Sequence, residues 1–295
     1  MAKEKETVAL SSVIAAFFLT GFKFVVGIMT GSLGIISEAL HSFLDLLAAV
    51  ITFISVRISG KPADEEHHFG HGKVENLSAL IQTVLLLVTC IWIVYEAVNR
   101  LITKDYHIEV TIWSYIVVVS SIIVDFSRSR ALARVAKKHN SQALEADAIH
   151  FSTDIWSSTA VLIGLIGVDV FDYSDADPIA ALLVACIILF VCYRLGSKAI
   201  DVLLDKASKQ TIRSVIEVLS EHSEIEHFHN LKVRSAGADT FISFNIHMKA
   251  NTDFVAVHQF CDHLEKDIMQ KIPLSQVYIH AEPEEVETGH APSLL

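Results

Sequence analysis

Long apolar runs fill the first two thirds of the chain, and polar residues gather in the short stretches between them. Each run is close to the ~20 residues that a membrane-spanning helix needs. The pattern therefore predicts a membrane domain built of α-helices. Its six expected spanning segments are Val8–Met29, Leu33–Val56, Leu77–Asn99, Val110–Phe126, Gln142–Val168 and Pro178–Leu203.

The apolar runs end near Lys206, and shorter segments with two different periodicities follow. Thr211–His222 and Phe254–Ile272 have the periodicity of amphipathic helices. Three segments instead alternate between apolar and polar residues, as strands do. These expected strands are Leu231–Ser235, Thr240–Met248 and Val277–His280. The order αββαβ predicts a small α+β domain whose helices lie on one face of a sheet.

These patterns divide the chain into three parts. We expect a transmembrane domain over residues 1–206, a small α+β domain over 207–283 and a disordered tail over 284–295. The formal net charge of −11 argues against a nucleic-acid partner and fits a protein that handles cations. Four cysteines without paired spacing do not predict a disulfide framework.

Basic residues between the apolar runs predict which ends of the helices face the cytoplasm, because Lys and Arg are enriched on that side. They occur near the N-terminus, in Ser59–Lys73, in the connection Asp125–Asn140 and in Arg194–Lys206. The connection Asp169–Asp177 instead has four aspartates and no basic residue. An even number of spans with this pattern places both chain termini in the cytoplasm of an integral membrane protein.

One pattern of metal ligands occurs twice inside the apolar runs, as His41–Asp45 and as His150–Asp154. Residues at i and i+4 lie on one helix face, so each imidazole points the same way as its carboxylate. An ionisable group near the bilayer centre costs roughly 2.5–3.5 kcal/mol, so it needs a partner or a purpose. Two such pairs would supply two nitrogens and two oxygens, a tetrahedral set suited to zinc. Hydrogen bonding of the two pairs to each other, without a metal, is the weaker explanation, because apolar residues would be more stable there.

Three other carboxylates lie in the same segments. Glu38 and Asp147 each precede a histidine of the repeated pattern by three residues. For both, lining a polar cavity is as good an interpretation as a role in ion access. Asp125 is expected to form a local ion pair with Arg128.

A second group of ligand types lies in the polar loop Ser59–Lys73. Asp64, His67 and His71 have short spacing, and neighbouring glycines would allow tight turns around a site. A solvated polar loop is an equally good interpretation of the same residues.

Histidines also recur beside the expected strands and on the second helix of the α+β domain. Because several could converge across one small sheet, we predict a metal site there. Its candidate ligands are His229, His247, His258, His280 and Glu282. The remaining histidines of this region are interpreted as surface residues, namely His222, His227, His263 and His290.

Together these features resemble the cation diffusion facilitator family over nearly the whole chain. The resemblance is carried by Gly31-Ser32-Leu33, Ser37–Asp45, Pro62-Ala63-Asp64, His68–Glu75, Glu145–Asp154 and Leu203-Leu204-Asp205. It implies a homodimeric exporter that exchanges cytoplasmic divalent metal for protons, in the inner membrane of a bacterial cell. It also implies six membrane helices and a cytoplasmic domain with a metallochaperone-like fold.

The resemblance also implies residue roles. The transport site would be His41, Asp45, His150 and Asp154, with a histidine first as in the zinc-preferring pattern. The loop site would be Asp64, His67 and His71, and metal between protomers would bind at His229, His258, His280 and Glu282. Lys73 and Asp205 match a charge interlock between the protomers. Asn245 departs from the pattern where some relatives place histidine, and His247 follows two residues later.

Other function classes fit less well. An intramembrane metalloprotease needs a glutamate directly after the first histidine of its motif, whereas Ser42 follows His41 and Phe151 follows His150. The prediction is therefore a transporter and not an enzyme. A passive channel, a membrane metal sensor without transport, and export of iron, cobalt, manganese or cadmium instead of zinc all remain open.

Overall fold

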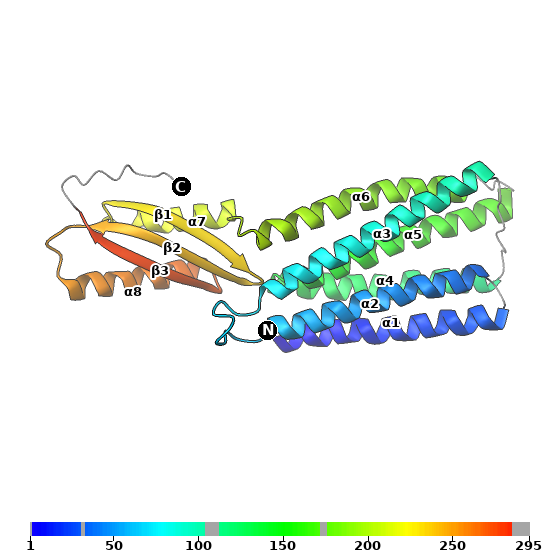
Figure 1. Cartoon of the computed structure of the whole chain (residues 1–295), viewed down its shortest axis with the longest axis horizontal. Coiled ribbons are helices and arrows are strands. Elements are labelled where there is room, and N and C mark those ends of the chain that lie inside the picture. The colour runs from blue at the N-terminus through cyan, green and yellow to red at the C-terminus, as the bar shows by residue number, and fades with distance from the viewer. Residues whose placement is uncertain (1, 31–32, 104–111, 172–175, 285–295) are drawn as a thin grey trace. The chain divides into compact units, whose positions relative to one another are not determined.

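The computed structural model describes residues 2–30, 33–103, 112–171 and 176–284 (Figure 1). Several predicted features lie wholly or partly outside these residues: the Gly31-Ser32-Leu33 motif, the connection Asp169–Asp177, and the tail after Glu284 with His290. The chain forms two compact units, Met1–Ile200 and Asp201–Leu295.

The first unit is helical. Its helices are α1 (Ala2–Thr30), α2 (Leu33–Ser59), α3 (Lys73–Thr103), α4 (Ile112–His139), α5 (Gln142–Phe171) and α6 (Ala176–Leu203, continuing three residues into the second unit). Among the described residues, four helices are long and apolar enough to cross a membrane, namely α1, α2, α3 and α6. Large apolar side chains point outward along them, for example Phe18 at 68% exposure and Phe190 at 66%. A protein surrounded by water would rarely leave such patches uncovered.

Helix α4 is longer than the sequence predicts. The segment Asp125–Asn140, expected to be a connection between spans, is helical as far as His139. It contains no Gly or Pro before Asn140 and is rich in good helix formers. The chain reverses at Asn140, whose φ is 49°, and the Ser141 N–H then donates to the carbonyl of Ala136. The basic residues therefore lie on a helix and not in a loop.

Small and medium apolar side chains hold these helices together. One buried cluster joins α1, α2, α4 and α5 around Ala9, Ala49, Leu132, Leu144 and Phe151. A second buried cluster joins α3 and α6 around Leu86, Cys90, Ala185, Ile188 and Cys192. Small residues let membrane helices approach closely, and this close packing brings polar groups of α2, α4 and α5 together.

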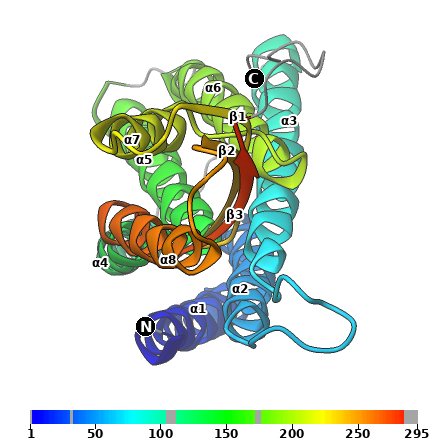
Figure 2. The ribbon, with the colours of Figure 1, turned by 90° about the vertical axis from the view of Figure 1, so that its left-hand side faces the viewer.

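The second unit is a three-stranded sheet with two helices on one face (Figures 1 and 2). Its elements are α7 (Lys209–Glu221), β1 (His227–Ala236), β2 (Asp239–Met248), α8 (Phe254–Lys271) and β3 (Ser275–Pro283). The strand order is β1-β2-β3, with β1 antiparallel and β3 parallel to β2. Parallel neighbours need a crossover, which α8 provides after its N-cap Asp253.

Alternation along the strands separates an apolar face from a polar one. Ile242 and Ile246 of β2 are fully buried against Leu219 of α7 and against Leu264 and Ile268 of α8. Asn245 and His247 of β2 point to the other face of the sheet. The residues paired with them on β1 and β3 share that face, and they include the predicted ligands His229, His280 and Glu282. In β1 the pairing is interrupted between His229 and Lys232, where Asn230 has a φ of 55°.

Candidate metal sites

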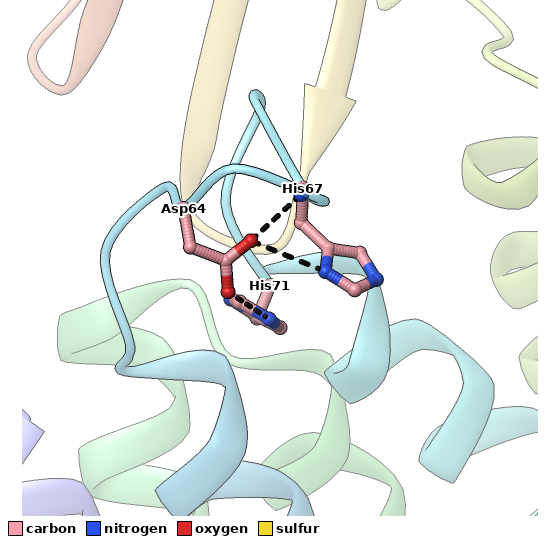
Figure 3. Close-up of side chains that lie close together, drawn as sticks. All are labelled: Asp64, His67 and His71. Carbon is pink, nitrogen blue, oxygen red and sulfur yellow. Dashed lines mark hydrogen bonds and ion pairs between the residues drawn. The ribbon is translucent and has the colours of Figure 1, made fainter.

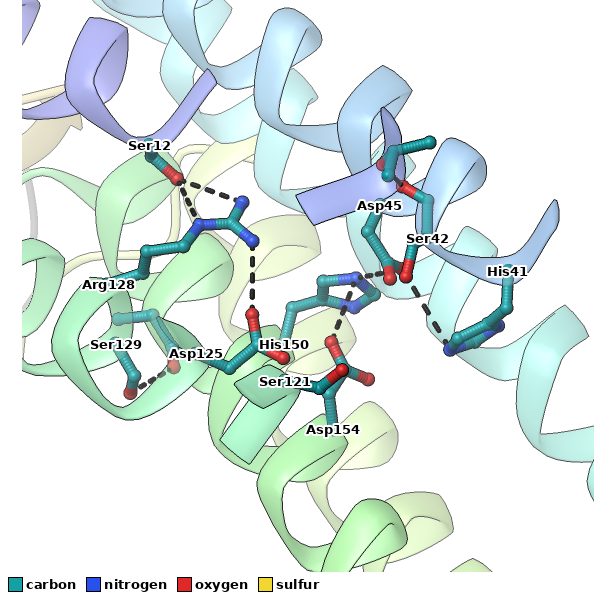
Figure 4. A network of polar contacts seen from close by, with 12 residues as sticks. Ser12, His41, Ser42, Asp45, Ser121, Asp125, Arg128, Ser129, His150 and Asp154 are labelled. Carbon is teal, nitrogen blue, oxygen red and sulfur yellow. Dashed lines mark hydrogen bonds and ion pairs between the residues drawn. The ribbon is translucent and has the colours of Figure 1, made fainter. Parts of the chain in front are cut away.

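Three of the four predicted intramembrane ligands converge in the helical unit (Figure 4). One oxygen or nitrogen from each of Asp45 on α2 and His150 and Asp154 on α5 lies within 4.8 Å of the other two. His150 Nε2 is 3.2 Å from Asp45 Oδ1 and 3.6 Å from Asp154 Oδ2. We call these three residues the membrane cluster. The i, i+4 spacing places His150 and Asp154 on one face of α5, and the packing of α2 on α5 adds Asp45.

His41 is the outlying member of the predicted set. Its Nε2 lies 4.0 Å from Asp45 Oδ1, and its side chain is less deeply buried than that of His150. Figure 4 shows the His41 ring on α2 pointing toward Asp45. His41 therefore lies beside the membrane cluster and outside the group of three converging ligands.

The donor atoms of the membrane cluster suit a cation. His150 is 5% exposed, and among the described residues neither its Nδ1 nor Asp154 Oδ2, both buried, has a hydrogen-bond partner. Buried polar atoms in native proteins are normally satisfied. One imidazole and two carboxylates, with a second imidazole nearby, form the nitrogen and oxygen set that divalent zinc accepts.

A buried lysine lies beside the membrane cluster. Lys23 of α1 is buried, donates to Ser42 Oγ at 2.7 Å and lies 3.7 Å from Glu38 Oε1. Sequence reasoning missed Lys23, although a lysine inside an apolar segment is itself a signal of function. Glu38 therefore has an ionic partner on another helix, and its predicted role in lining a polar cavity or in ion access stays a prediction.

Arg128 connects three helices on the other side of the cluster. Its guanidinium donates to Asp125 Oδ1 at 3.1 Å and to Ser12 Oγ at 3.1 and 3.2 Å. The guanidinium carbon also lies 3.5 Å from the ring centroid of Phe151. The predicted ion pair of Asp125 with Arg128 is confirmed. Asp147, by contrast, is fully buried on α5.

The loop between α2 and α3 gathers all three of its predicted ligands, which we call the loop cluster (Figure 3). Asp64 Oδ1 lies 3.4 Å from His67 Nδ1, and Asp64 Oδ2 lies 3.4 Å from His71 Nε2. The backbone N–H of His67 donates to Asp64 at 2.7 Å, and this hydrogen bond holds the pKa of the carboxyl below its usual range. Gly70 turns the chain with a φ of 73°. The carboxylate is thus kept in the charged form that a metal requires.

The polar face of the sheet brings together His229, His247 and Glu282, which we call the sheet cluster. His229 Nε2 lies 3.3 Å and His247 Nε2 lies 3.2 Å from Glu282 Oε2. Asn245 donates to Glu282 Oε1 at 2.6 Å. Burial alone would raise the pKa of Glu282, but hydrogen bonds from Asn245 and His229 lower it below its usual range. Asn245, the departure from the family pattern, thus stabilises the ionised form of the Glu282 carboxylate.

One predicted ligand, His280, lies at the margin of the sheet cluster, whereas His258 lies on α8, and one unexpected residue joins the cluster. His280 is exposed, with Nε2 3.4 Å from Glu282 Oε1, whereas the exposed His258 lies near Asp262 on α8. His227, interpreted from the sequence as a surface residue, stacks on His229 with ring centroids 6.0 Å apart. Strand β1 starts four residues earlier than expected, which places His227 and His229 on one face.

Lys73 and Asp205, the predicted interlock, belong to different units of the chain. Lys73 begins α3, and Asp205 follows α6 with a φ of 57°. Within its own unit, Asp205 Oδ2 lies 4.0 Å from Arg234 Nη1. Pairing between Lys73 and Asp205 stays a prediction.

Comparisons with known proteins cover the same two parts of the chain. Residues 9–204 match the family model of the cation efflux transmembrane domain, and residues 207–284 match that of the cation efflux protein cytoplasmic domain. The cation-efflux pump FieF of Salmonella newport (strain SL254) is 31% identical over 259 residues, which are 86% of this chain and 84% of the pump. FieF of Citrobacter koseri is 30% identical over 280 residues, covering 93% and 91% of the two chains.

Solved structures give a narrower comparison. Two structures of CzrB, one of them in a Zn form, are each 30% identical to this chain with a TM-score of 0.26. They cover 27% and 26% of this chain, and 99% and 90% of their own. That score carries no argument about the fold, so the assignment rests on the family models and the FieF relatives. The chain therefore belongs to the cation diffusion facilitator family, whose members are integral membrane transporters of cations rather than enzymes.

Proposed function

We propose that this protein exports Zn²⁺ from a bacterial cytoplasm in exchange for protons, as a homodimer working by alternating access. The membrane cluster carries the proposal, because it brings one imidazole and two carboxylates close together inside the helical unit. The names of the relatives, cation-efflux pumps, support export of a divalent cation. In this proposal all six long helices cross the inner membrane, and both termini lie in the cytoplasm.

The proposed transport cycle uses His41, Asp45, His150 and Asp154 to hold the cargo ion. Zinc binds neutral imidazoles and ionised carboxylates, so binding releases protons and proton binding releases zinc. Free imidazole titrates near neutral pH, which suits this exchange. His41 lies beside the other three residues, which fits a site that closes around the ion when the His41 side chain moves toward them.

The other clusters have supporting roles in this proposal. The loop cluster would bind zinc at the loop between α2 and α3. The sheet cluster would bind a regulatory zinc ion, because two imidazoles and one carboxylate fit that ion. His258 and His280 would be further ligands of it. The domain over residues 207–283 would associate with its copy in the homodimer. Lys73 and Asp205 would form the charge interlock between the protomers.

Zinc movement in vesicles tests the central proposal. Purified protein in liposomes is expected to move zinc faster when the compartment that zinc enters is the more acidic one, because protons then flow down their gradient in the opposite direction. Zinc and proton fluxes should be followed together with two dyes. Zinc flux that does not depend on the pH gradient and moves no protons would indicate a channel. Zinc binding without flux would indicate a sensor.

His41→Asp is expected to widen the range of transported metals. The change replaces a nitrogen ligand by a harder oxygen, which favours manganese or iron relative to zinc. Competition between zinc and manganese in the vesicle assay measures the preference. His68→Asp is the matched control, because the His68 imidazole lies in the exposed loop beside the Glu65 carbonyl. An unchanged preference in His41→Asp would show that His41 does not select the metal.

A further inference from the structure

A fourth group of ligand-type side chains lies on the helices of the second unit, away from the polar face of the sheet. His222 Nε2 lies 3.2 Å from Asp267 Oδ2, and His263 Nε2 lies 3.5 Å from the same oxygen. We call these residues the helix cluster. Neither histidine was expected from the sequence to be more than a surface residue.

Buried neighbours hold together the two helices that carry these three side chains. His222 is the C-cap of α7, and its backbone N–H donates to the carbonyl of Leu219. Its ring packs edge-on against Phe260 of α8, with centroids 5.6 Å apart. His263 and Asp267 are four residues apart on α8, so they share one helix face. Buried contacts of Leu219 with Leu264 and Ile268 hold α7 against α8.

The two distances to Asp267 fit a shared metal ion as well as they fit an ion pair. Ligands about 2.0–2.1 Å from a tetrahedral zinc ion are about 3.3–3.4 Å from each other. The two nitrogen-to-oxygen distances lie close to that value.

One side chain has to move for both nitrogens to bind the same ion. The ring centroids of His222 and His263 are 6.1 Å apart and the rings are nearly perpendicular. The His222 and Asp267 side chains are largely buried and already in place, whereas that of His263 is 67% exposed. Rotation of His263 about its own side-chain bonds can therefore close the site.

We propose that His222, His263 and Asp267 bind a divalent transition-metal ion, with Zn²⁺ the best match for two nitrogens and one oxygen and with water completing the shell. The ion would join the C-terminal end of α7 to the middle of α8. This site is separate from the sheet cluster, which lies on the other face of the sheet. It does not depend on the proposed transport function.

Counting bound zinc in the full-length protein tests the proposal. Parent protein in detergent, dialysed against buffered micromolar Zn²⁺, is expected to retain one more ion per chain than either Asp267→Asn or His263→Gln. Asp262→Asn is the matched control, because Asp262 also lies on α8 four residues after a histidine but 3.8 Å from that single imidazole. This control is expected to retain the same number as the parent.

Anomalous X-ray scattering at the zinc edge then locates the ion. A peak beside Asp267 in crystals of the parent, lost in His263→Gln, is the expected result. Equal ion counts in the parent and His263→Gln, or no peak beside Asp267, would overturn the proposal. His263 is exposed, so replacing it leaves the fold intact, and the result stays decisive even if Asp267→Asn fails to fold.

Discussion

Asp45→Asn is expected to lower zinc binding in the membrane domain by more than about 100-fold and to stop transport. Asp45 Oδ1 lies between His150 and His41, so it is the oxygen that connects the two halves of the proposed site. Even residues that only support metal ligands typically change affinity about 10–100-fold when replaced. Asparagine keeps the shape of the side chain but removes the charge that attracts the cation.

Zinc uptake by vesicles measures this effect, with intact folding checked by size-exclusion chromatography. Glu96→Gln on α3 is the control, because Glu96 is a half-exposed carboxylate that pairs with Arg100 in its own helix. We expect this control to transport at the parent rate. Parent-like uptake by Asp45→Asn would show that the transport site lies elsewhere.

Lys5→Met is expected to destabilise the helical unit by about 3–5 kcal/mol, because it leaves a buried carboxylate without its cation. Lys5 Nζ lies 2.6 Å from Glu75 Oε1, and the two side chains are 10% and 1% exposed. Ser59 donates to the same oxygen at 2.7 Å, and Ser141 donates to the other carboxylate oxygen. Glu75 therefore connects α1, α2 and α3 to the turn before α5.

The double variant Lys5→Met with Glu75→Gln should recover most of that loss, because glutamine can keep the two serine contacts without a charge. Denaturation by SDS in mixed micelles compares the free energies of unfolding. Lys198 and Glu145 form a pair of similar length, 2.5 Å, with side chains 48% and 41% exposed. The equivalent double change there should alter stability by less than about 1 kcal/mol. Additive losses at Lys5 and Glu75 would contradict the expected coupling.

Local sequence patterns predicted the features whose geometry depends on a single segment of the chain. Spacing of four residues correctly placed His150 beside Asp154, and short spacing correctly gathered Asp64, His67 and His71. Alternation and helical periodicity located the strands and helices after Lys206 to within a few residues. In each case the interacting groups lie within one helix, strand or turn, so the periodicity of that element determines their geometry.

Contacts between distant segments were not predictable in this way. Lys5 and Glu75 are 70 positions apart, and nothing in either segment indicates the other. The length of α4 was underestimated because its basic residues suggested a loop, whereas Arg128 is buried and paired with Asp125. His222 was assigned to the surface because its partner Asp267 lies on a different helix. Contacts between residues far apart in the chain depend on how the helices pack, and this packing cannot be inferred from the pattern of a single sequence.

The irregularity in β1 affects how the sheet meets other chains. Strand β1 lies at one edge, where an exposed row of backbone groups could pair with a strand from another molecule. Its pairing with β2 shifts between His229 and Lys232, and Asn230 adopts a left-handed conformation there. A bulge of this kind twists the strand and breaks the regular row of donors and acceptors. The β1 edge is therefore a poor template for fibril-like growth when the protein is concentrated.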